Sequence, residues 1–401
     1  MFVGEAQETM SKMMLVVLLI IELLTVMIFQ SSALVDDYET QDLSFIIQMK
    51  VTFSNPKNGS AAWNLTEEDR MISLFMNNSW QLVYLINCSH PFESVKTDED
   101  GNQVAVLLFQ KSKLMQGENI SYVTAYRAIS KPRLIPEIKE DASQSIYEVP
   151  ADLSEQYCRE VGPWLTNNSQ LRQLAYDIAK NETRVLTIVK KLVEWITHNI
   201  NYTVHEVPYY ANETYIERKG DCDDQAVLLA TLCRILGIPA YIQIGCIYLP
   251  AATYVSETYW EGHVTSVQKR IGWHGWTMVY VPPWGWLPVD LTYVTGGLGD
   301  PLSAIKHGAV TLQETIQYMN ITQTDYVALS HASKELLIKN GFYIYTEDEM
   351  ILETPKEPAS NVQGLDPITA IIVPVATAAT IMGTYIIFYT RKIKKQDQTT
   401  C

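Results

Sequence analysis

Three residues that together could activate a thiol lie in two separate stretches of this sequence. Cys222 lies in Gly220–Tyr241, GDCDDQAVLLATLCRILGIPAY. His274 and Asp290 lie near opposite ends of Trp273–Thr292, WHGWTMVYVPPWGWLPVDLT. A histidine that is oriented by a carboxylate can remove a thiol proton and so create a nucleophile. These residues therefore predict attack by Cys222, with His274 as the base and Asp290 as the group that orients it.

The spacing around Cys222 predicts an amphipathic helix that begins at this residue. Apolar residues recur every three or four positions, at Ala226, Leu229, Ala230, Cys233 and Leu236. Asp221 can cap the helix, which places Cys222 in the first turn, where the helix dipole favours a thiolate. Asp223 and Asp224 oppose a thiolate by charge repulsion. A buried structural cysteine is the alternative.

The stretch that contains His274 and Asp290 predicts a β-hairpin. Alternating residues over Trp276–Tyr280 indicate a strand, Pro282-Pro283 interrupts it, and Trp286–Leu291 resumes an extended pattern. A hairpin brings residues that are distant in sequence close together across its strands. The imidazole and the carboxylate are therefore expected to pair.

Over Gln170–Tyr293 the sequence resembles a transglutaminase-like domain, a branch of the papain-like thiol enzymes. The resemblance rests on G-D-C-D-D-Q-A with the following R-x-x-G-I-P-A-Y, on H-x-W, and on W-x-P-V-D-L-T. It implies that Cys222, His274 and Asp290 are the nucleophile, the base and the orienting residue. It also implies an α+β papain-like core, in which the nucleophile helix packs on an antiparallel sheet. Many members have an acidic residue where this chain has Met278.

Aromatic residues near these positions are candidates for binding a substrate. Trp276 belongs to the H-x-W motif, and Tyr259 and Trp260 lie in a predicted loop that follows a strand over Ile242–Tyr248. Aromatic side chains on a loop can line a substrate groove, although packing beneath the sheet is the alternative. No metal or cofactor is predicted, because the acidic residues around Cys222 lack a calcium-loop pattern and the histidines lack zinc spacing.

The rest of the chain predicts additional parts around this domain. Strand patterns dominate residues 34–150 and predict a β-sandwich-like domain that spaces the second domain from a membrane or binds a partner. The transglutaminase-like domain is assigned to residues 151–310, and residues 311–366 to an extension and tether. The extension is expected to contain a helix over Asp325–Lys339, then a strand pair, Phe342–Tyr345 and Met350–Thr354.

Two apolar segments predict that the protein crosses or leaves a membrane. Residues 1–33 contain the run Met13–Phe29, which fits a signal peptide or an uncleaved anchor. Residues 367–390 carry no charge and are long enough to span a bilayer. The basic residues that follow place residues 391–401 in the cytoplasm. The bulk of the chain is therefore expected to be extracellular, with the C-terminal helix in contact with membrane lipid.

Other features of the sequence agree with this topology. Asn-x-Ser/Thr motifs lie only between the two apolar segments, at Asn58, Asn64, Asn77, Asn87, Asn119, Asn167, Asn181, Asn201, Asn212 and Asn320. They predict a glycoprotein. The net charge of −15 argues against a nucleic-acid partner. Cys88 and Cys158 could form a disulfide, which the sequence alone does not decide.

Two functions from different classes fit the sequence. The first is a cell-surface cysteine-dependent acyl-transfer enzyme, a protease, amidase or acyltransferase that acts on a protein or peptide through Cys222, His274 and Asp290. Hydrolysis is favoured over crosslinking because no lysine-binding pocket is evident. The second is a binding or structural module that keeps the fold without catalysis.

Overall fold

The computed structural model describes residues 41–57, 61–293 and 300–353. The predicted signal or anchor segment, the predicted membrane helix over residues 367–390 and the tail over residues 391–401 lie outside these ranges. Within the described ranges, none of the helices combines the length and the apolar character needed to cross a bilayer. The described residues from Leu43 onward belong to one unit.

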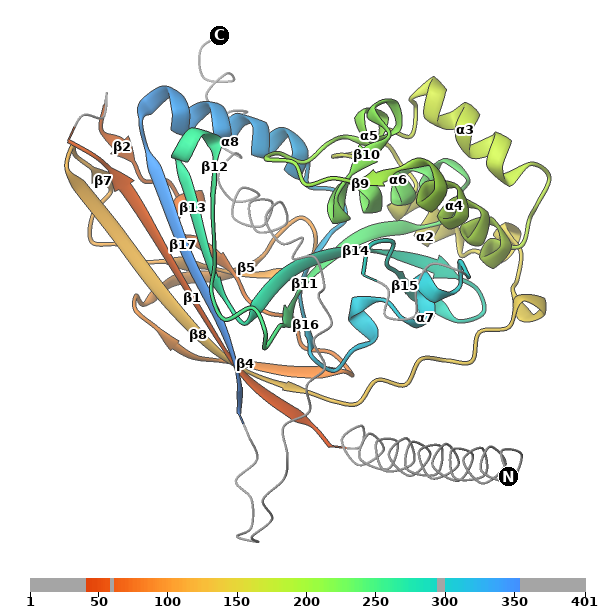
Figure 1. Cartoon of the computed structure of the whole chain (residues 1–401), viewed down its shortest axis with the longest axis horizontal. Coiled ribbons are helices and arrows are strands. Elements are labelled where there is room, and N and C mark those ends of the chain that lie inside the picture. The colour runs from red at the N-terminus through yellow and green to blue at the C-terminus, as the bar shows by residue number, and fades with distance from the viewer. Residues whose placement is uncertain (1–40, 58–60, 294–299, 354–401) are drawn as a thin grey trace, which may run out of the picture. The chain divides into compact units, whose positions relative to one another are not determined.

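The largest sheet joins strands from the beginning, the middle and the end of the described chain (Figure 1). Its order is β12–β13–β17–β1–β8–β4. In that order the strands are Val255–Tyr259, Val264–Lys269, Tyr343–Glu353, Leu43–Asn55, Glu118–Ser130 and Gln81–Cys88. The strands β13 and β17 are parallel, and the other neighbours are antiparallel. Because β17 lies between β1 and β13, the strands predicted to form a separate β-sandwich share a sheet with residues 255–269 and 343–353.

Two predictions for this sheet are wrong. The sequence predicts two strands at the end of the described chain, but Tyr343–Glu353 is one continuous strand. Its acidic middle part pairs with two cations at the end of the neighbouring strand β13 and just after it, because Lys269 pairs with Glu347 at 2.5 Å and Arg270 pairs with Glu349. The predicted loop after residue 248 contains the β12–β13 hairpin.

A second, four-stranded antiparallel sheet carries the elements that contain the predicted site. Its order is β15–β14–β11–β16, with strands Gly285–Val289, Ile271–Val281, Ala240–Tyr248 and Thr315–Ile321. The predicted hairpin is confirmed as β14 and β15. The helix predicted to begin at Cys222 is confirmed as α6, Cys222–Ile235, and every residue in it is buried. The structure is thus a mixture of helices and sheets, with α6 packed on an antiparallel sheet.

Arg234 fixes the end of α6 against this sheet. Its guanidinium donates to the carbonyl of Ala240 at 2.6 Å and to the carbonyl of Thr322 at 3.0 Å. It also lies over the Trp164 ring, 4.2 Å from the ring centroid. Burial lowers the pKa of Arg234 to about 9. These contacts hold the far end of α6, so that its first turn keeps a fixed position on β14.

Shorter elements complete the fold. The other helices are α2 (Ala151–Tyr157), α3 (Ser169–Ala179), α4 (Val185–Asn199), α5 (Ala211–Glu217), α7 (Ser303–Lys306) and α8 (Tyr326–Asn340). A three-stranded sheet has the order β3–β6–β5, with strands Met71–Ser73, Gln103–Leu107 and Phe92–Thr97. Two small pairs are β2–β7, Trp63–Asn64 with Lys113–Leu114, and β9–β10, Asn201–Tyr202 with Lys219–Gly220. The helix predicted over Asp325–Lys339 is confirmed as α8.

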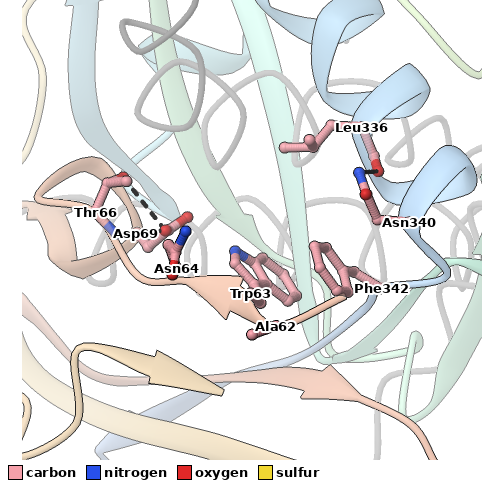
Figure 2. Close-up of a pocket in the computed structure, with 8 residues that line it drawn as sticks. All are labelled: Ala62, Trp63, Asn64, Thr66, Asp69, Leu336, Asn340 and Phe342. Carbon is pink, nitrogen blue, oxygen red and sulfur yellow. Dashed lines mark hydrogen bonds between the residues drawn. The ribbon is translucent and has the colours of Figure 1, made fainter. Parts of the chain in front are cut away.

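A small cavity of about 140 Å³ lies between β2 and the end of α8 (Figure 2). Trp63 and Phe342 stack in its wall, with ring centroids 4.5 Å apart. Asp69 accepts a hydrogen bond from the backbone N–H of Thr66 at 2.7 Å. None of the predicted site residues lines this cavity.

Candidate active site

A network of hydrogen bonds around Asp224 fixes the start of α6. The Asp224 carboxylate accepts from the backbone N–H of Asp221 at 3.1 Å, from Nδ1 of His205 at 2.9 Å and from the backbone N–H of Tyr209 at 2.7 Å. Gly220 is required here, because a Cβ at this residue would lie 2.6 Å from the Cβ of Asp224. The segment before α6 is therefore attached to its first turn, and Cys222 is the first residue of the helix.

His274 and Asp290 form the pair that the sequence predicts. Nε2 of His274 lies 2.9 Å from Oδ2 of Asp290, and both side chains are buried. Oδ1 of Asp290 accepts from the backbone N–H groups of Thr292 and Tyr293, and Oδ2 also accepts from the N–H of Ala309 at 2.8 Å. Donors on both oxygens fix the orientation of the carboxylate. The bond at Nε2 leaves Nδ1 as the nitrogen that can exchange a proton with another group.

The helix α6 packs on the strand that carries His274. The hydroxyl of Thr277 in β14 donates to the carbonyl of Ala226 at 3.1 Å. Cys222 is one helical turn before Ala226 and so lies on the same side of the helix. The strand β15 pairs only with residues 277–281 of β14. At His274, this edge of β14 therefore extends beyond the end of β15. This open edge lies toward the end of β14 where α6 begins.

Gly308 is important for the site because it packs closely against Asp290. The sequence does not single out this residue. A Cβ at Gly308 would lie 2.6 Å from the Cβ of Asp290 and 3.4 Å from its Oδ2. We expect Gly308→Ala to displace the Asp290 carboxylate and to lower any activity that depends on it by about 10-fold or more, by analogy with small misplacements of catalytic groups. Unchanged turnover in this variant, with an unchanged urea midpoint, would contradict the expectation.

Two further carboxyl groups beside Cys222 are buried. Burial, and then the charges of Asp223 and Asp224, raise the pKa of Asp221 well above its usual range. Burial and the charge of Asp224 raise the pKa of Asp223 to about 6. These shifts favour the neutral forms. The raised pKa of Asp221 reduces the charge repulsion that the sequence predicts toward a Cys222 thiolate, whereas Asp223, with a pKa of about 6, is still mostly ionised at pH 7.

The predicted substrate-binding aromatic residues are all buried, and they lie in two different clusters. Trp276 is on β14, with its ring centroid 6.0 Å from that of His274. Tyr259 and Trp260 pack instead in a hydrophobic cluster with Trp63 and Phe342. The indole N–H of Trp260 donates to the carbonyl of Glu206 at 2.8 Å. The structure therefore brings only Trp276 of the three next to the His274 ring.

Tyr202 is a neighbour of the thiol that the sequence analysis does not identify. It is in β9, where it pairs with Gly220, two residues before Cys222. Tyr202 is 40% exposed, and partial burial of its hydroxyl, followed by the charge of Cys222, raises its pKa. The signal in the sequence was weak, because only the β9–β10 pairing brings this tyrosine to the start of α6.

The structure describes four cysteines besides Cys222. Cys88 and Cys158, which could have formed a disulfide, are both free thiols in the structure. Burial raises the pKa of Cys158 to about 11 and also raises the pKa of Cys88. Burial likewise raises the pKa of Cys233 and of Cys246. These four thiols are therefore protonated at neutral pH.

Comparisons with known proteins agree with the resemblance noted in the sequence. Residues 172–291 match the family model described as the transglutaminase-like superfamily, and this range includes Cys222, His274 and Asp290. A search of curated proteins gave no match.

Several solved structures are similar to this chain. A proposed cysteine protease from Cytophaga hutchinsonii is 15% identical with a TM-score of 0.46, over 82% of this chain and 95% of that chain. The periplasmic domain of TgpA from Pseudomonas aeruginosa is 18% identical with a TM-score of 0.31, over 62% of this chain and 88% of that chain. Red sea bream transglutaminase is 11% identical with a TM-score of 0.27, over 63% of this chain and 48% of that chain.

The family match and the arrangement of α6, β14 and β15 cover the same part of the chain. The chain therefore contains a transglutaminase-like domain over residues 172–291, within a mixed α/β fold.

Proposed function

We propose that this protein is a cell-surface, cysteine-dependent acyl-transfer enzyme that hydrolyses peptide or amide bonds through Cys222, His274 and Asp290. One observation carries the proposal. His274, on the strand against which the Cys222 helix packs, is hydrogen-bonded to Asp290 at 2.9 Å. We propose that the thiol approaches His274 over the open edge of β14.

In the proposed reaction, Nδ1 of His274 accepts the proton of the Cys222 thiol, and the sulfur attacks the substrate carbonyl carbon. The backbone N–H of Cys222, at the start of α6, stabilises the oxyanion. The imidazolium then donates its proton to the leaving amine, and a thioester remains on Cys222. Water attacks the thioester with His274 as base, which releases the carboxylic acid and restores the thiol. Asp290 holds the imidazole by Nε2 throughout.

The extracellular location and the lipid contact are part of this proposal. Support comes from the predicted membrane segments and from the exposure of most described glycosylation motifs. The exposed acceptors are Asn64, Asn77, Asn87, Asn119, Asn167, Asn181 and Asn201, whereas Asn212 and Asn320 are half-buried. The topology can be tested by enzymatic deglycosylation of the protein purified from a eukaryotic host. A decrease in its mass would support an extracellular location.

A non-catalytic binding or structural module is the second candidate. The observation in its favour is burial, because Cys222 is only 3% exposed. A substrate would have to reach a sulfur that neighbouring side chains largely cover.

Intact mass spectrometry distinguishes the two candidates. The full chain is incubated with peptide and glutaminamide libraries, with and without a primary amine, and Cys222→Ala serves as the matched control. The enzyme predicts a thioester adduct on Cys222 and turnover that the control lacks, with the amine product separating crosslinking from hydrolysis. Equal behaviour of the two proteins over all libraries would support the binding module.

A further inference from the structure

A surface groove lies between the helices α3 and α4, which pack against each other (Figure 1). Its volume is about 680 Å³, within the range of about 300–1,000 Å³ that is typical of sites for small molecules. The second half of each helix lines it, and none of Cys222, His274 and Asp290 does. The groove is therefore separate from the proposed reaction centre.

The lining of the groove combines apolar surface with charges of both signs. Leu174 and Ile178 of α3 and Trp195 of α4 supply the apolar part. Arg218 holds the indole of Trp195 in place, because its guanidinium lies 5.0 Å from the ring centroid. The polar lining residues are Asp177, Lys180, Lys191, Glu194, His198 and Asn199. The two carboxylates balance the two ammonium groups, so the groove favours a neutral ligand that both donates and accepts hydrogen bonds.

A pyranose sugar has the chemistry that this lining fits. Its hydroxyl groups donate and accept hydrogen bonds, and the C–H groups on one face of its ring can pack on an indole through dispersion contacts. Nδ1 of His198 lies 2.7 Å from the carbonyl of Glu194, and Nδ2 of Asn199 donates to the carbonyl of Trp195 at 2.8 Å. Each bond uses one polar atom of its side chain. Nε2 of His198 and Oδ1 of Asn199 thus remain for hydroxyl groups of a sugar.

A glycosylation motif lies directly beside the groove. Asn181 begins the motif Asn181-Glu182-Thr183 in the connection between α3 and α4, and it follows Lys180, which lines the groove. The Asn181 side chain belongs to an exposed residue, so the folded chain can carry a sugar there. A sugar that is joined at this residue has an effective concentration in the millimolar range, so a weak affinity is enough to fill the groove.

We propose that the groove between α3 and α4 holds the first sugars of an N-linked glycan on Asn181. A cellular glycosyltransferase forms the bond between the amide nitrogen of Asn181 and the anomeric carbon of an activated sugar diphosphate. The bond from that carbon to the diphosphate oxygen breaks, the diphosphate leaves with its electron pair, and the amide loses one proton. The inference rests on the extracellular location in the proposed function, and it is independent of catalysis.

The bound glycan connects the two helices that support the Cys222 helix. Both α3 and α4 pack on α6. A sugar that contacts Ile178 of α3 and Trp195 of α4 covers apolar surface of both helices, which is favourable in water. The glycan therefore stabilises this part of the fold as well as covering it.

Lysine acetylation measured by peptide mass spectrometry tests whether the groove is filled. The full chain is made in a eukaryotic host, and Asn181→Gln supplies the same protein without this glycan. Lys191 is half-buried and lines the groove from α4. We expect it to react about tenfold more slowly in the glycosylated wild type, which corresponds to a groove that is filled about nine-tenths of the time. Lys113, an exposed residue of β7, should react equally in both proteins.

Two variants that keep the motif distinguish binding in the groove from simple shielding by a nearby glycan. Trp195→Ala and His198→Ala should both raise the rate at Lys191 toward that of Asn181→Gln. His198 is exposed, so its replacement should leave the fold intact, which circular dichroism checks. His331→Ala, at an exposed histidine of α8, is the matched control and should keep the slow rate.

The outcomes that would overturn the inference separate it from the proposed function. Equal rates at Lys191 in the wild type and in Asn181→Gln, with Asn181 occupied, mean that the glycan extends into solvent. Occupancy of Asn119 without occupancy of Asn181 removes the ligand but leaves the extracellular location in place. Absence of a glycan from all motifs contradicts both this inference and the location. Turnover of peptide substrates by Asn181→Gln tests the proposed catalysis independently.

Discussion

Asp290→Asn is expected to lower kcat of the proposed hydrolysis by a factor of about 10³–10⁴, the loss seen when the orienting aspartate of a triad becomes an amide. The physical reason lies in the donors around this side chain. Asp290 accepts from His274 and from the backbone N–H groups of Thr292, Tyr293 and Ala309. An asparagine must direct its NH₂ group at one of these donors. The imidazole then loses its orientation or takes the wrong tautomer.

Asp300→Asn is the matched control for this variant. Asp300 is exposed and accepts from the backbone N–H of Leu302 at 3.0 Å, so its charge is removed without a change at His274. Steady-state kinetics of both variants on a peptide substrate give the comparison. A kcat for Asp290→Asn within threefold of the control would show that the carboxylate does not orient the base.

Asp348→Asn is expected to stabilise the protein at pH 8 by about 4 kcal/mol. Burial raises the pKa of Asp348 from 3.8 to about 7. Its folded pKa is thus above its unfolded pKa, so its contribution to stability is full below pH 4 and is lost as the pH rises through 7. The amide oxygen of asparagine can still accept the hydrogen bond that the Trp273 indole donates to Asp348 at 2.9 Å.

Urea unfolding between pH 5 and pH 8 measures this effect. The wild-type protein should lose stability relative to Asp348→Asn as the pH rises, and the difference between the two should be largest at pH 8. Asp177→Asn, at an exposed aspartate, should follow the wild type. A constant difference between wild type and Asp348→Asn over this range would mean that Asp348 is ionised throughout.

The sequence predicts the elements around the site well because local chemistry determines them. The apolar period after Cys222, with Asp221 before it, predicts α6 from its first residue. The Pro282-Pro283 interruption predicts the turn between β14 and β15. The His274–Asp290 pair follows once these strands are aligned, because a hairpin has few registers.

The features that the sequence does not predict depend on contacts between distant segments. The acidic run before Met350 is typical of a turn, but Lys269 at the end of β13 and Arg270 directly after it compensate its charges, so the strand continues. Gly308 is important for the site only because the chain returns after a long connection and packs at this residue against Asp290. The aromatic side chains of Tyr259 and Trp260 are typical of a substrate groove. In the structure they are buried in a hydrophobic cluster with residues of the six-stranded sheet and α8.

The pH dependence of Cys222 alkylation by iodoacetamide tests the proposed site most directly, with the modified residue located by peptide mass spectrometry. The burial of Cys88, Cys158, Cys233 and Cys246 raises their pKa values, so they should react slowly at neutral pH. Cys401, outside the described residues, is replaced by serine. The proposed site predicts a Cys222 pKa below the usual 8.5, and an increase of about one to three units in His274→Ala. A Cys222 that reacts only in denaturant, or with the same pH profile in both proteins, would contradict it.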